Sequence, residues 1–176
     1  QPVGPSGDLQ GRKMRGTQTF TGVFKLLGAS PVVLPPAEIY SSLEKGVVDG
    51  AGWPVIGVLG YRWYEVAKYL VRPTFGRLVY PVFFNLDAWN KLTDRQKNII
   101  SEEARKAEDA FYVEWVKLAN DEETQLKAKG AQITELKTGK DKLNKELGDA
   151  EFDIAIKQDP KSIGELRNFA KSKGLY

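Results

Sequence analysis

The sequence contains neither cysteine nor histidine, and these two absences exclude much of the usual chemistry of enzymes. Without cysteine there is no disulfide, no thiolate nucleophile and no cysteine-bound zinc. Without histidine there is no Ser-His-Asp triad, no imidazole metal site and no acid–base step through imidazole. No window of the sequence approaches the ~18 consecutive apolar residues that a membrane-spanning helix requires. These absences favour a binding function over a catalytic one.

The composition is that of a folded protein. Of the 176 residues, 41% are hydrophobic and 28% are charged, so the chain can bury a core. The length suits one domain or a large piece of a two-lobed protein. Lys and Arg number 26 against 23 Asp and Glu, which gives a net charge of +3, and the two signs are interleaved. A nucleic-acid-binding protein would more often cluster its positive charge, so we expect no nucleic-acid partner.

The first residues, QPVGPSGD, lack the basic and apolar regions of a secretory signal. Their proline and glycine content is typical of a linker that leads into a folded lobe, and we assign residues 1–7 to such a linker. We therefore expect the chain to be a mature, processed or truncated form.

Residues 8–53 alternate short extended segments with short helices. We predict strands over residues 12–15, 31–34 and 47–49, a helix over residues 19–27 between the first two, and a second helix that starts near Pro36 and ends at Gly46. This order implies parallel strands joined by right-handed crossovers. The carboxyl ends of the strands then share one rim, where ligands bind in open α/β sheets.

Residues 54–92 begin with a glycine-rich connection. Apolar residues at helical spacing predict a helix over residues 61–70. Residues 77–84 are rich in Val, Tyr and Phe and are predicted to form a strand, in which Pro81 indicates an edge or a bulge.

Residues 93–130 are predicted to form one long helix. Thr93 and Gln96 have the spacing of a capping box, and apolar residues then recur at steps of three and four, without Gly or Pro, as far as Gly130. Such a helix is roughly 50 Å long, so we expect it to brace two bodies or to bend around one. The last zone, residues 131–176, is predicted to hold a strand over 131–136 and helices over 141–157 and 161–173.

Four segments, in the same order along the chain, resemble a known bacterial family. They are DLQGRKMR at residues 8–15, FKLLGASPV at 24–32, PPAEIYSSLEKGVVDG at 35–50 and WYEVAKYL at 63–70. They resemble the segments DLKGxKxR, FxxLGAxPV, PxxExYxxLxxGxVDG and FYEVxKYL of the solute-binding proteins of tripartite ATP-independent periplasmic (TRAP) transporters. The resemblance runs from about residue 8 to residue 130, and several motifs in register make it specific.

The resemblance implies a fold, a location and partners. The fold is α/β, a periplasmic-binding-protein-like two-lobed architecture with βαβαβ units, a mixed sheet and one long bracing helix; segments of the N-terminal lobe are expected to be missing. Residues 8–53 would belong to the C-terminal lobe, and residues 54–92 would cross toward the other lobe. The implied function is that of a periplasmic, monomeric receptor, not itself membrane-spanning, that captures a small organic acid and delivers it to membrane subunits of a transporter. The resemblance implies no catalytic step and no cofactor.

Arg15 is the first candidate site residue. It lies at the predicted carboxyl end of a strand, beside Gly16 and shortly before a helix N-terminus. Its guanidinium offers a planar fork that matches a carboxylate through two parallel hydrogen bonds. In the resembling family the arginine at this motif position binds the ligand carboxylate. The alternative from the residues alone is a solvated charge on a strand.

Trp53 is the second candidate, on the same predicted rim. Its ring can cover the apolar body of a ligand and its indole N–H can donate a hydrogen bond; the alternative is a tryptophan packed into the core of the lobe. The sequence departs from the family here, because many members carry Glu-Asn after the Asp-Gly pair, and an oxo-acid branch carries Glu-Trp and uses the Glu with a metal ion. This chain has Gly52 before Trp53, so we expect no bound metal.

Three weaker candidates complete the predicted site. Thr17 and Gln18 follow Arg15 and can supply neutral polar contacts, although turn or capping roles are the alternative. Pro36 occupies a place where some members of the resembling family contact the ligand, and it is predicted either to shape the pocket wall or only to begin a helix.

Two other functions fit the sequence. A small α/β enzyme acting on a carboxylate substrate would have to use Arg, Tyr or carboxylate side chains, because the chain lacks His, Cys, a dinucleotide-binding fingerprint and a phosphate-binding loop. A helical interaction protein could be built on residues 93–130, but the apolar face there is too mixed for a heptad zipper. Ligand-induced stabilisation without turnover favours the receptor, turnover favours the enzyme, and partner-dependent folding favours the interaction protein.

Overall fold

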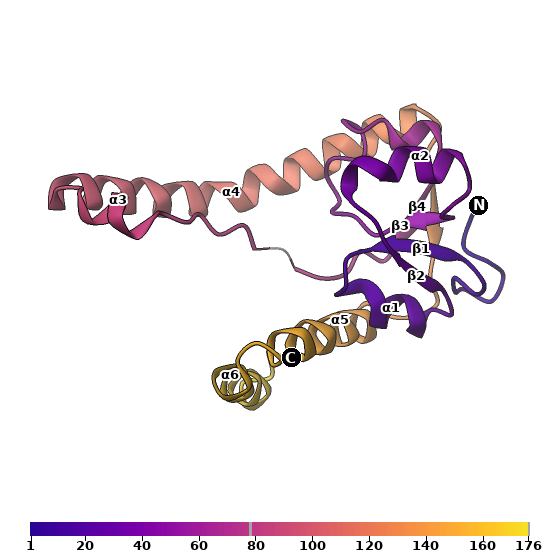
Figure 1. The fold of residues 1–176 in the computed structure, drawn as a ribbon. Helices are drawn as coiled ribbons and strands as arrows, with labels where there is room; N and C mark the ends of the chain where they lie inside the picture. The colour runs from indigo at the N-terminus through magenta and orange to yellow at the C-terminus, as the bar shows by residue number, and fades with distance from the viewer. Residues whose placement is uncertain (78, 176) are drawn as a thin grey trace.

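The protein has an α/β body from which long helices extend. The structure is a computed structural model that describes residues 1–77 and 79–175. Figure 1 shows the body around the N-terminus, with α4 (Asp94–Ala128) reaching far from it and the C-terminal helices α5 (Lys140–Ala155) and α6 (Pro160–Ser172) extending on the same side. The predicted α/β class is confirmed.

The first sheet has three parallel strands in the order β2-β1-β3. β1 (Lys13–Gly16) lies between β2 (Ser30–Val33) and β3 (Gly50–Ala51). In this register Arg15 lies opposite Val32 on β2 and Ala51 on β3. The predicted parallel arrangement is confirmed, and it places Arg15 near the carboxyl end of the central strand.

Two helical crossovers join these strands. α1 (Phe20–Leu26) ends just before Gly28, whose φ of 76° is a conformation that glycine adopts without steric cost. The second crossover combines a short 3-10 helix, η1 (Pro36–Glu38), with α2 (Ile39–Glu44). A proline suits the first turn of η1, because the N–H that it lacks would have no partner there.

A second sheet pairs two strands that lie far apart in the sequence. β4 (Tyr69–Arg72) and β5 (Gln132–Glu135) are parallel, with Tyr69 opposite Gln132. The strand predicted over residues 131–136 is therefore confirmed. Its partner comes from a segment for which we predicted a helix.

The core lies where α1 packs against α5. Val23 and Leu143 are fully buried, and the remaining members of the core cluster are Leu9, Met14, Phe24, Leu27, Ala29, Leu136 and Leu147. Because α1 covers one face of the three-stranded sheet (Figure 1), this core also supports the strand that carries Arg15.

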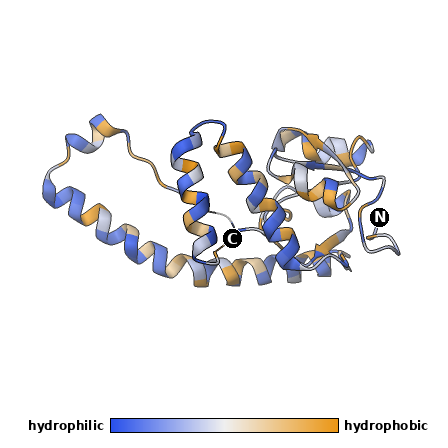
Figure 2. Ribbon diagram, turned by 90° about the horizontal axis from the view of Figure 1, so that it is seen from below, coloured by the Kyte–Doolittle hydropathy of each residue, from blue (hydrophilic) through white to orange (hydrophobic). Residues whose placement is uncertain are grey.

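Helix α4 begins with the predicted capping box and is mostly exposed. Thr93 Oγ1 accepts from the Gln96 N–H at 3.3 Å, and Gln96 Oε1 accepts from the Thr93 N–H at 2.9 Å. Only Glu122 and Leu126, in its last two turns, are buried. Figure 2 shows the helix running beside the body with polar residues along most of its length.

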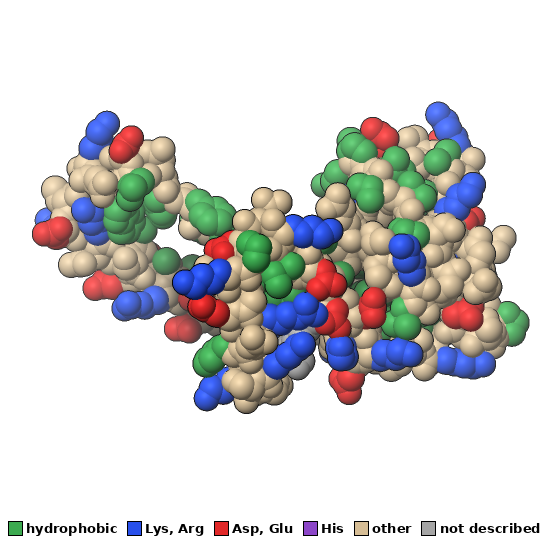
Figure 3. All heavy atoms as spheres, turned by 60° about the horizontal axis from the view of Figure 1, so that its bottom comes forward, with side chains coloured by type: hydrophobic (Ala, Val, Ile, Leu, Met, Phe, Trp, Pro, Cys, Tyr) green, Lys and Arg blue, Asp and Glu red, His purple; other side chains and the backbone are tan. Residues whose placement is uncertain are grey.

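The segment before α4 exposes apolar side chains. α3 (Leu86–Asn90) turns the chain back at the outer end of α4 (Figure 1). Val79, Val82 and Phe83 are each more than four fifths exposed, at 83%, 83% and 85%. Figure 3 shows hydrophobic side chains gathered on this outlying part of the molecule.

Three predictions about local structure are wrong. The helix predicted over residues 61–70 is a short 3-10 helix, η2 (Trp63–Glu65), followed by β4, because residues 69–72 pair with β5 instead of continuing a helix. The strand predicted over residues 77–84 does not form among residues 77 and 79–84, where Pro81 cannot donate to a ladder; residue 78 lies outside the described residues.

The third correction concerns the last strand of the first sheet, which was predicted over residues 47–49 and begins at Gly50. The N–H groups of Val47 and Val48 donate to the Ser42 carbonyl oxygen at 2.9 and 3.3 Å, which closes the end of α2. These two residues therefore cap the C-terminal end of α2 instead of opening the strand.

Within residues 1–77 and 79–175, no helix is both long enough and apolar enough to cross a bilayer.

Candidate functional site

Arg15 is held in one orientation by backbone carbonyl groups. Its exposed fraction is 4%. Nε and Nη2 donate to the Leu34 carbonyl oxygen at 2.9 and 2.7 Å, and Nη1 donates to the Gly52 carbonyl oxygen at 3.4 Å. Leu34 follows β2 and Gly52 follows β3, so the segments that leave both flanking strands fix the guanidinium.

The charge of Arg15 has no carboxylate partner in the part of the chain that the structure describes. Burial lowers the pKa of the guanidinium because desolvation disfavours the charged form, yet arginine stays protonated in proteins. A guanidinium has five N–H groups, and the contacts to Leu34 and Gly52 use three of them. Arg15 is thus a fixed buried cation with further N–H groups for an anion.

Trp53 lies beside Arg15 and is also part of an aromatic cluster. The Arg15 guanidinium carbon lies 5.6 Å from the centroid of the Trp53 ring, within range of a cation–π contact. Trp53 packs edge-on against Trp63 at 4.9 Å and Tyr61 at 5.6 Å between centroids. The ring is half-buried, so it packs as core and also faces the arginine. Both interpretations made from the sequence describe part of its environment.

Thr17 and Gln18 lie in the exposed turn that leads from β1 into α1. Thr17 Oγ1 shares a hydrogen bond of 2.8 Å with Thr19 Oγ1, and the Thr17 carbonyl oxygen accepts from the Phe20 N–H at 3.1 Å. The Gln18 carbonyl oxygen accepts from the Thr21 N–H at 3.1 Å. The turn role weighed for both residues is therefore present, and a role in ligand binding stays a prediction.

Pro36 is exposed and begins η1. The role of starting a helix, one of the two that we predicted for it, is therefore present. It lies two residues after Leu34, whose carbonyl group holds Arg15. A role for Pro36 in the pocket wall stays a prediction.

The glycine before Trp53 lies against two phenyl rings. A Cβ atom added at Gly52 would lie 2.9 Å from Phe20 Cδ1 and Cε1, and 3.1 Å from Phe24 Cζ. These contacts are closer than ordinary packing allows, so any side chain here would displace Phe20 or Phe24. The two rings therefore occupy the space that a metal-binding side chain at position 52 would need.

Glu122 is a residue of this region that our reading of the sequence missed. Its carboxylate accepts from the Gly57 N–H at 2.9 and 2.8 Å and from the Leu59 N–H at 2.8 Å. The side chain is buried although it carries a charge. A signal was present in the sequence, since Glu122 lies midway between Leu118 and Leu126 at steps of four and so falls on the same helical face.

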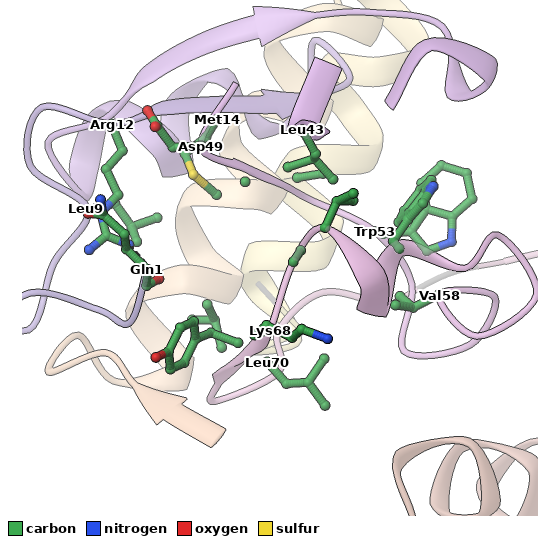
Figure 4. Close-up of a pocket in the computed structure, with 17 residues that line it drawn as sticks. Gln1, Leu9, Arg12, Met14, Leu43, Asp49, Trp53, Val58, Lys68 and Leu70 are labelled. Atoms are coloured by element: carbon green, nitrogen blue, oxygen red, sulfur yellow. Dashed lines mark hydrogen bonds between the residues drawn. The ribbon is translucent and has the colours of Figure 1, made fainter. Parts of the chain in front are cut away.

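Two cavities lie next to Trp53 but not around Arg15. The first cavity, of about 140 Å³, lies between β3 and β4, and its lining includes Met14, Trp53 and Leu70. In Figure 4 Trp53 and Val58 lie at one end of this cavity and Leu9 and Arg12 at the other. A second cavity of about 130 Å³ adjoins Trp53, Arg72 and Glu123. Trp53 thus lines both cavities.

The described residues do not offer a preformed metal centre. No group of three or more Asp or Glu side chains gathers closely enough to ligate an ion within residues 1–77 and 79–175. The absence of a metal requirement stays a prediction.

The sequence matches a family model described as "Bacterial extracellular solute-binding protein, family 7" over residues 1–152. Protein YiiZ of Salmonella typhimurium is 36% identical over 112 residues, which cover 62% of this chain and 34% of that protein. The C4-dicarboxylate-binding periplasmic protein DctP of Rhodobacter capsulatus is 30% identical over 127 residues, covering 62% of this chain and 38% of that protein.

The fold matches that of solved solute-binding proteins. A TRAP periplasmic solute-binding protein from Desulfovibrio salexigens, with bound orotic acid, superposes with a TM-score of 0.81 at 24% identity, covering 98% of this chain and 56% of that one. The matched part thus covers between about a third and just over half of the length of such proteins. The likeness agrees with the predicted α/β fold of two-lobed binding proteins.

Proposed function

Because the chain belongs to family 7 of the bacterial extracellular solute-binding proteins, we propose that it serves a TRAP transporter by capturing a small organic acid, with Arg15 holding the carboxylate. Family members are periplasmic solute-binding proteins and not enzymes, which disfavours the enzyme alternative. Location in the periplasm and delivery to membrane subunits are parts of the same proposal, since the chain spans only a portion of its relatives.

The observation that carries the proposal is the unneutralised charge of Arg15. A buried charge is costly unless it is paired or hydrogen-bonded. Here the Leu34 and Gly52 carbonyl groups fix the guanidinium, but no described carboxylate neutralises it. A carboxylate ligand would supply the missing charge and two acceptors in a geometry that matches the guanidinium fork.

Trp53 suggests what the rest of the ligand is like. Its half-buried ring lies beside the guanidinium and can cover a flat or apolar body attached to the carboxylate. A monocarboxylate with an apolar or aromatic body fits this pair of side chains. Thr17 and Gln18 would add neutral polar contacts, and Pro36 would shape the wall.

A metal-free site follows from the residue before Trp53. Gly52 offers no carboxylate, and Phe20 and Phe24 fill the space beside it. Ligand binding should therefore be independent of Na⁺ and Ca²⁺. A strong dependence of affinity on either ion would contradict this part of the proposal.

The proposal is tested by a thermal-shift screen of organic acids that includes orotate and succinate. A ligand at ~100 times its Kd stabilises the folded chain by about 2.7 kcal/mol, which is readily seen as a rise in Tm. Arg15→Met should abolish the rise, whereas Lys13→Met should retain it. Lys13 is a matched control because it lies on β1, two residues before Arg15, and its side chain is exposed.

Two outcomes would refute the proposal. The first is that no acid in the screen raises the Tm of the chain. The second is that an acid raises the Tm of Arg15→Met as much as that of the unmodified protein.

A further inference from the structure

The aromatic cluster beside Arg15 is carried by a loop that lacks regular structure. Between β3 and η2 the chain runs through residues 52–62 without a strand or a long helix. Tyr61 stacks on Trp63 at 5.2 Å between centroids, and both contact Trp53. The position of Trp53 therefore depends on how this loop is fixed.

Glu122 fixes the loop from the long helix. Its buried carboxylate accepts both the Gly57 and the Leu59 N–H groups, at distances between 2.8 and 2.9 Å. Hydrogen bonds to a charged acceptor are about twice as strong as those between neutral groups. No described Lys or Arg side chain forms an ion pair with Glu122, so the loop amides are its principal partners.

Gly57 connects this anchor directly to Trp53. A Cβ atom at Gly57 would lie 3.0 Å from Trp53 Nε1, so the backbone here lies against the indole edge. Its φ of 110° is a conformation that side-chain-bearing residues rarely adopt. The same peptide N–H that Glu122 holds thus belongs to the residue on which the Trp53 ring rests.

The far end of the loop has a separate anchor. Glu65 Oε2 accepts from the Tyr40 hydroxyl at 2.9 Å, and Glu65 Oε1 accepts from Arg62 Nε at 2.9 Å. This second anchor ties the loop to α2, within the body itself. Among the described residues, Glu122 supplies the side-chain hydrogen bonds that link residues 52–62 to α4.

We propose that Glu122 is a positioning residue through which α4 sets the place of Trp53 beside Arg15. A shift of α4 relative to the body would move the Gly57 and Leu59 amides and, through Gly57, the indole. The expected change in the position of Trp53 is inferred from the Glu122 hydrogen bonds and from the contact between Gly57 and the indole. The effect on ligand affinity rests on the proposed function.

The test replaces Glu122 and observes each tryptophan separately. The chain has four tryptophans, each of which gives one indole N–H signal in a two-dimensional ¹⁵N–¹H NMR spectrum, assigned through single Trp→Phe variants. Glu122→Ala removes all three hydrogen bonds. Glu122→Gln keeps one carbonyl oxygen but turns an NH₂ group toward a peptide N–H. Both variants should shift the signals of Trp53 and Trp63 and leave those of Trp89 and Trp115 in place.

Glu103→Gln is the control. Glu103 lies on an exposed part of α4 and pairs with Lys106, so its replacement removes an ion pair of the same helix without touching the loop amides or the two cavities beside Trp53. It should leave the indole signals of Trp53 and Trp63 unmoved. If Glu122 only stabilised the folded state, the Glu122 variants would have a lower Tm but unchanged indole signals, which would overturn the proposal. Loss of the folded spectrum in both Glu122 variants would overturn it too.

Ligand affinity is measured separately, with orotate as the probe. Glu122→Gln should weaken orotate binding by about tenfold, the effect of losing one charge-assisted hydrogen bond, while Glu103→Gln changes it less than twofold. Unchanged affinity together with shifted indole signals would remove the link to binding and so overturn that half of the proposal. If the unmodified chain binds no acid, the proposed function fails, but the NMR result still decides the positioning role.

Discussion

Gly52→Ala is a small change that should disturb both stability and the candidate site. The added methyl would lie 2.9 Å from two atoms of the Phe20 ring and 3.1 Å from Phe24 Cζ, and Phe24 is 3% exposed. Overpacking of this kind costs about 1–3 kcal/mol, because a ring or the backbone must shift. The Gly52 carbonyl group also accepts from Arg15 Nη1, so a backbone shift would loosen the guanidinium.

The assay is urea unfolding followed by circular dichroism, with Gly164→Ala as the control. Gly164 lies inside α6, and a Cβ atom there meets nothing within 4 Å. Its replacement should stabilise the protein by about 0.5–1 kcal/mol, because glycine is a poor helix former. For a chain of this length each kcal/mol corresponds to a change in Tm of about 2–4 °C.

A double-mutant cycle sharpens the result. Phe20→Leu makes room beside position 52, so the double variant Gly52→Ala/Phe20→Leu should lose less stability than the two single changes added together. If Gly52→Ala is as stable as the unmodified protein, or if the two changes are simply additive, the packing argument is refuted.

Three further predictions concern the core, the long helix and the pH. Leu143→Ala, at a fully buried position, should lower the free energy of unfolding by about 2–5 kcal/mol in urea titrations, whereas Leu166→Ala, 52% exposed, should change it by much less; equal losses would contradict the assigned core. Thr93→Ala removes the cap of α4 and should cost ~1 kcal/mol of stability or less by the same titration, and no loss would show that the capping box contributes nothing. The hydrogen bond from Lys127, with a smaller contribution from Arg72, holds the pKa of Glu123 below its ordinary value of 4.5. Because the folded-state pKa is the lower one, this stability is present above pH ~4.5 and is lost as the pH falls through the folded-state pKa. Glu123→Gln should therefore flatten the acid limb of the stability–pH curve, and an unchanged limb would contradict the pairing.

The parts of the fold that the sequence predicted are those governed by local patterns. The capping box at Thr93, the helix end at Gly28 and the proline start of η1 depend on residues a few positions apart, and all three are present. The parallel order of the first three strands also followed from the alternation of short strands and helices.

The errors arose where distant segments decide the structure. The apolar side chains of residues 61–70 recur at helical spacing. Residues 69–72 nevertheless pair with β5, which lies about sixty residues later in the chain. No pattern within residues 61–70 reveals that partner. The predicted strand around Pro81 failed for a related reason, since a strand needs a neighbour as well as a suitable composition.

The sequence predicted the charged residue of the candidate site and its aromatic neighbour, but not the groups that hold them in place. Arg15 and Trp53 were expected on the same rim, and they lie 5.6 Å apart, from guanidinium carbon to ring centroid. The carbonyl groups of Leu34 and Gly52 that hold Arg15 are backbone atoms, which no side-chain pattern encodes. The spacing of Glu122 with Leu118 and Leu126 indicated a shared helical face, but it did not identify the loop, more than sixty residues earlier, that Glu122 contacts.

The claim that Arg15 neutralises a carboxylate is tested most directly by calorimetric titration of an acid and its uncharged amide, such as orotate and orotamide, into the unmodified protein and Arg15→Met. We expect the unmodified protein to bind the acid at least about tenfold more tightly than the amide, and Arg15→Met to lose this preference. A preference for the acid that survives in Arg15→Met would contradict the account.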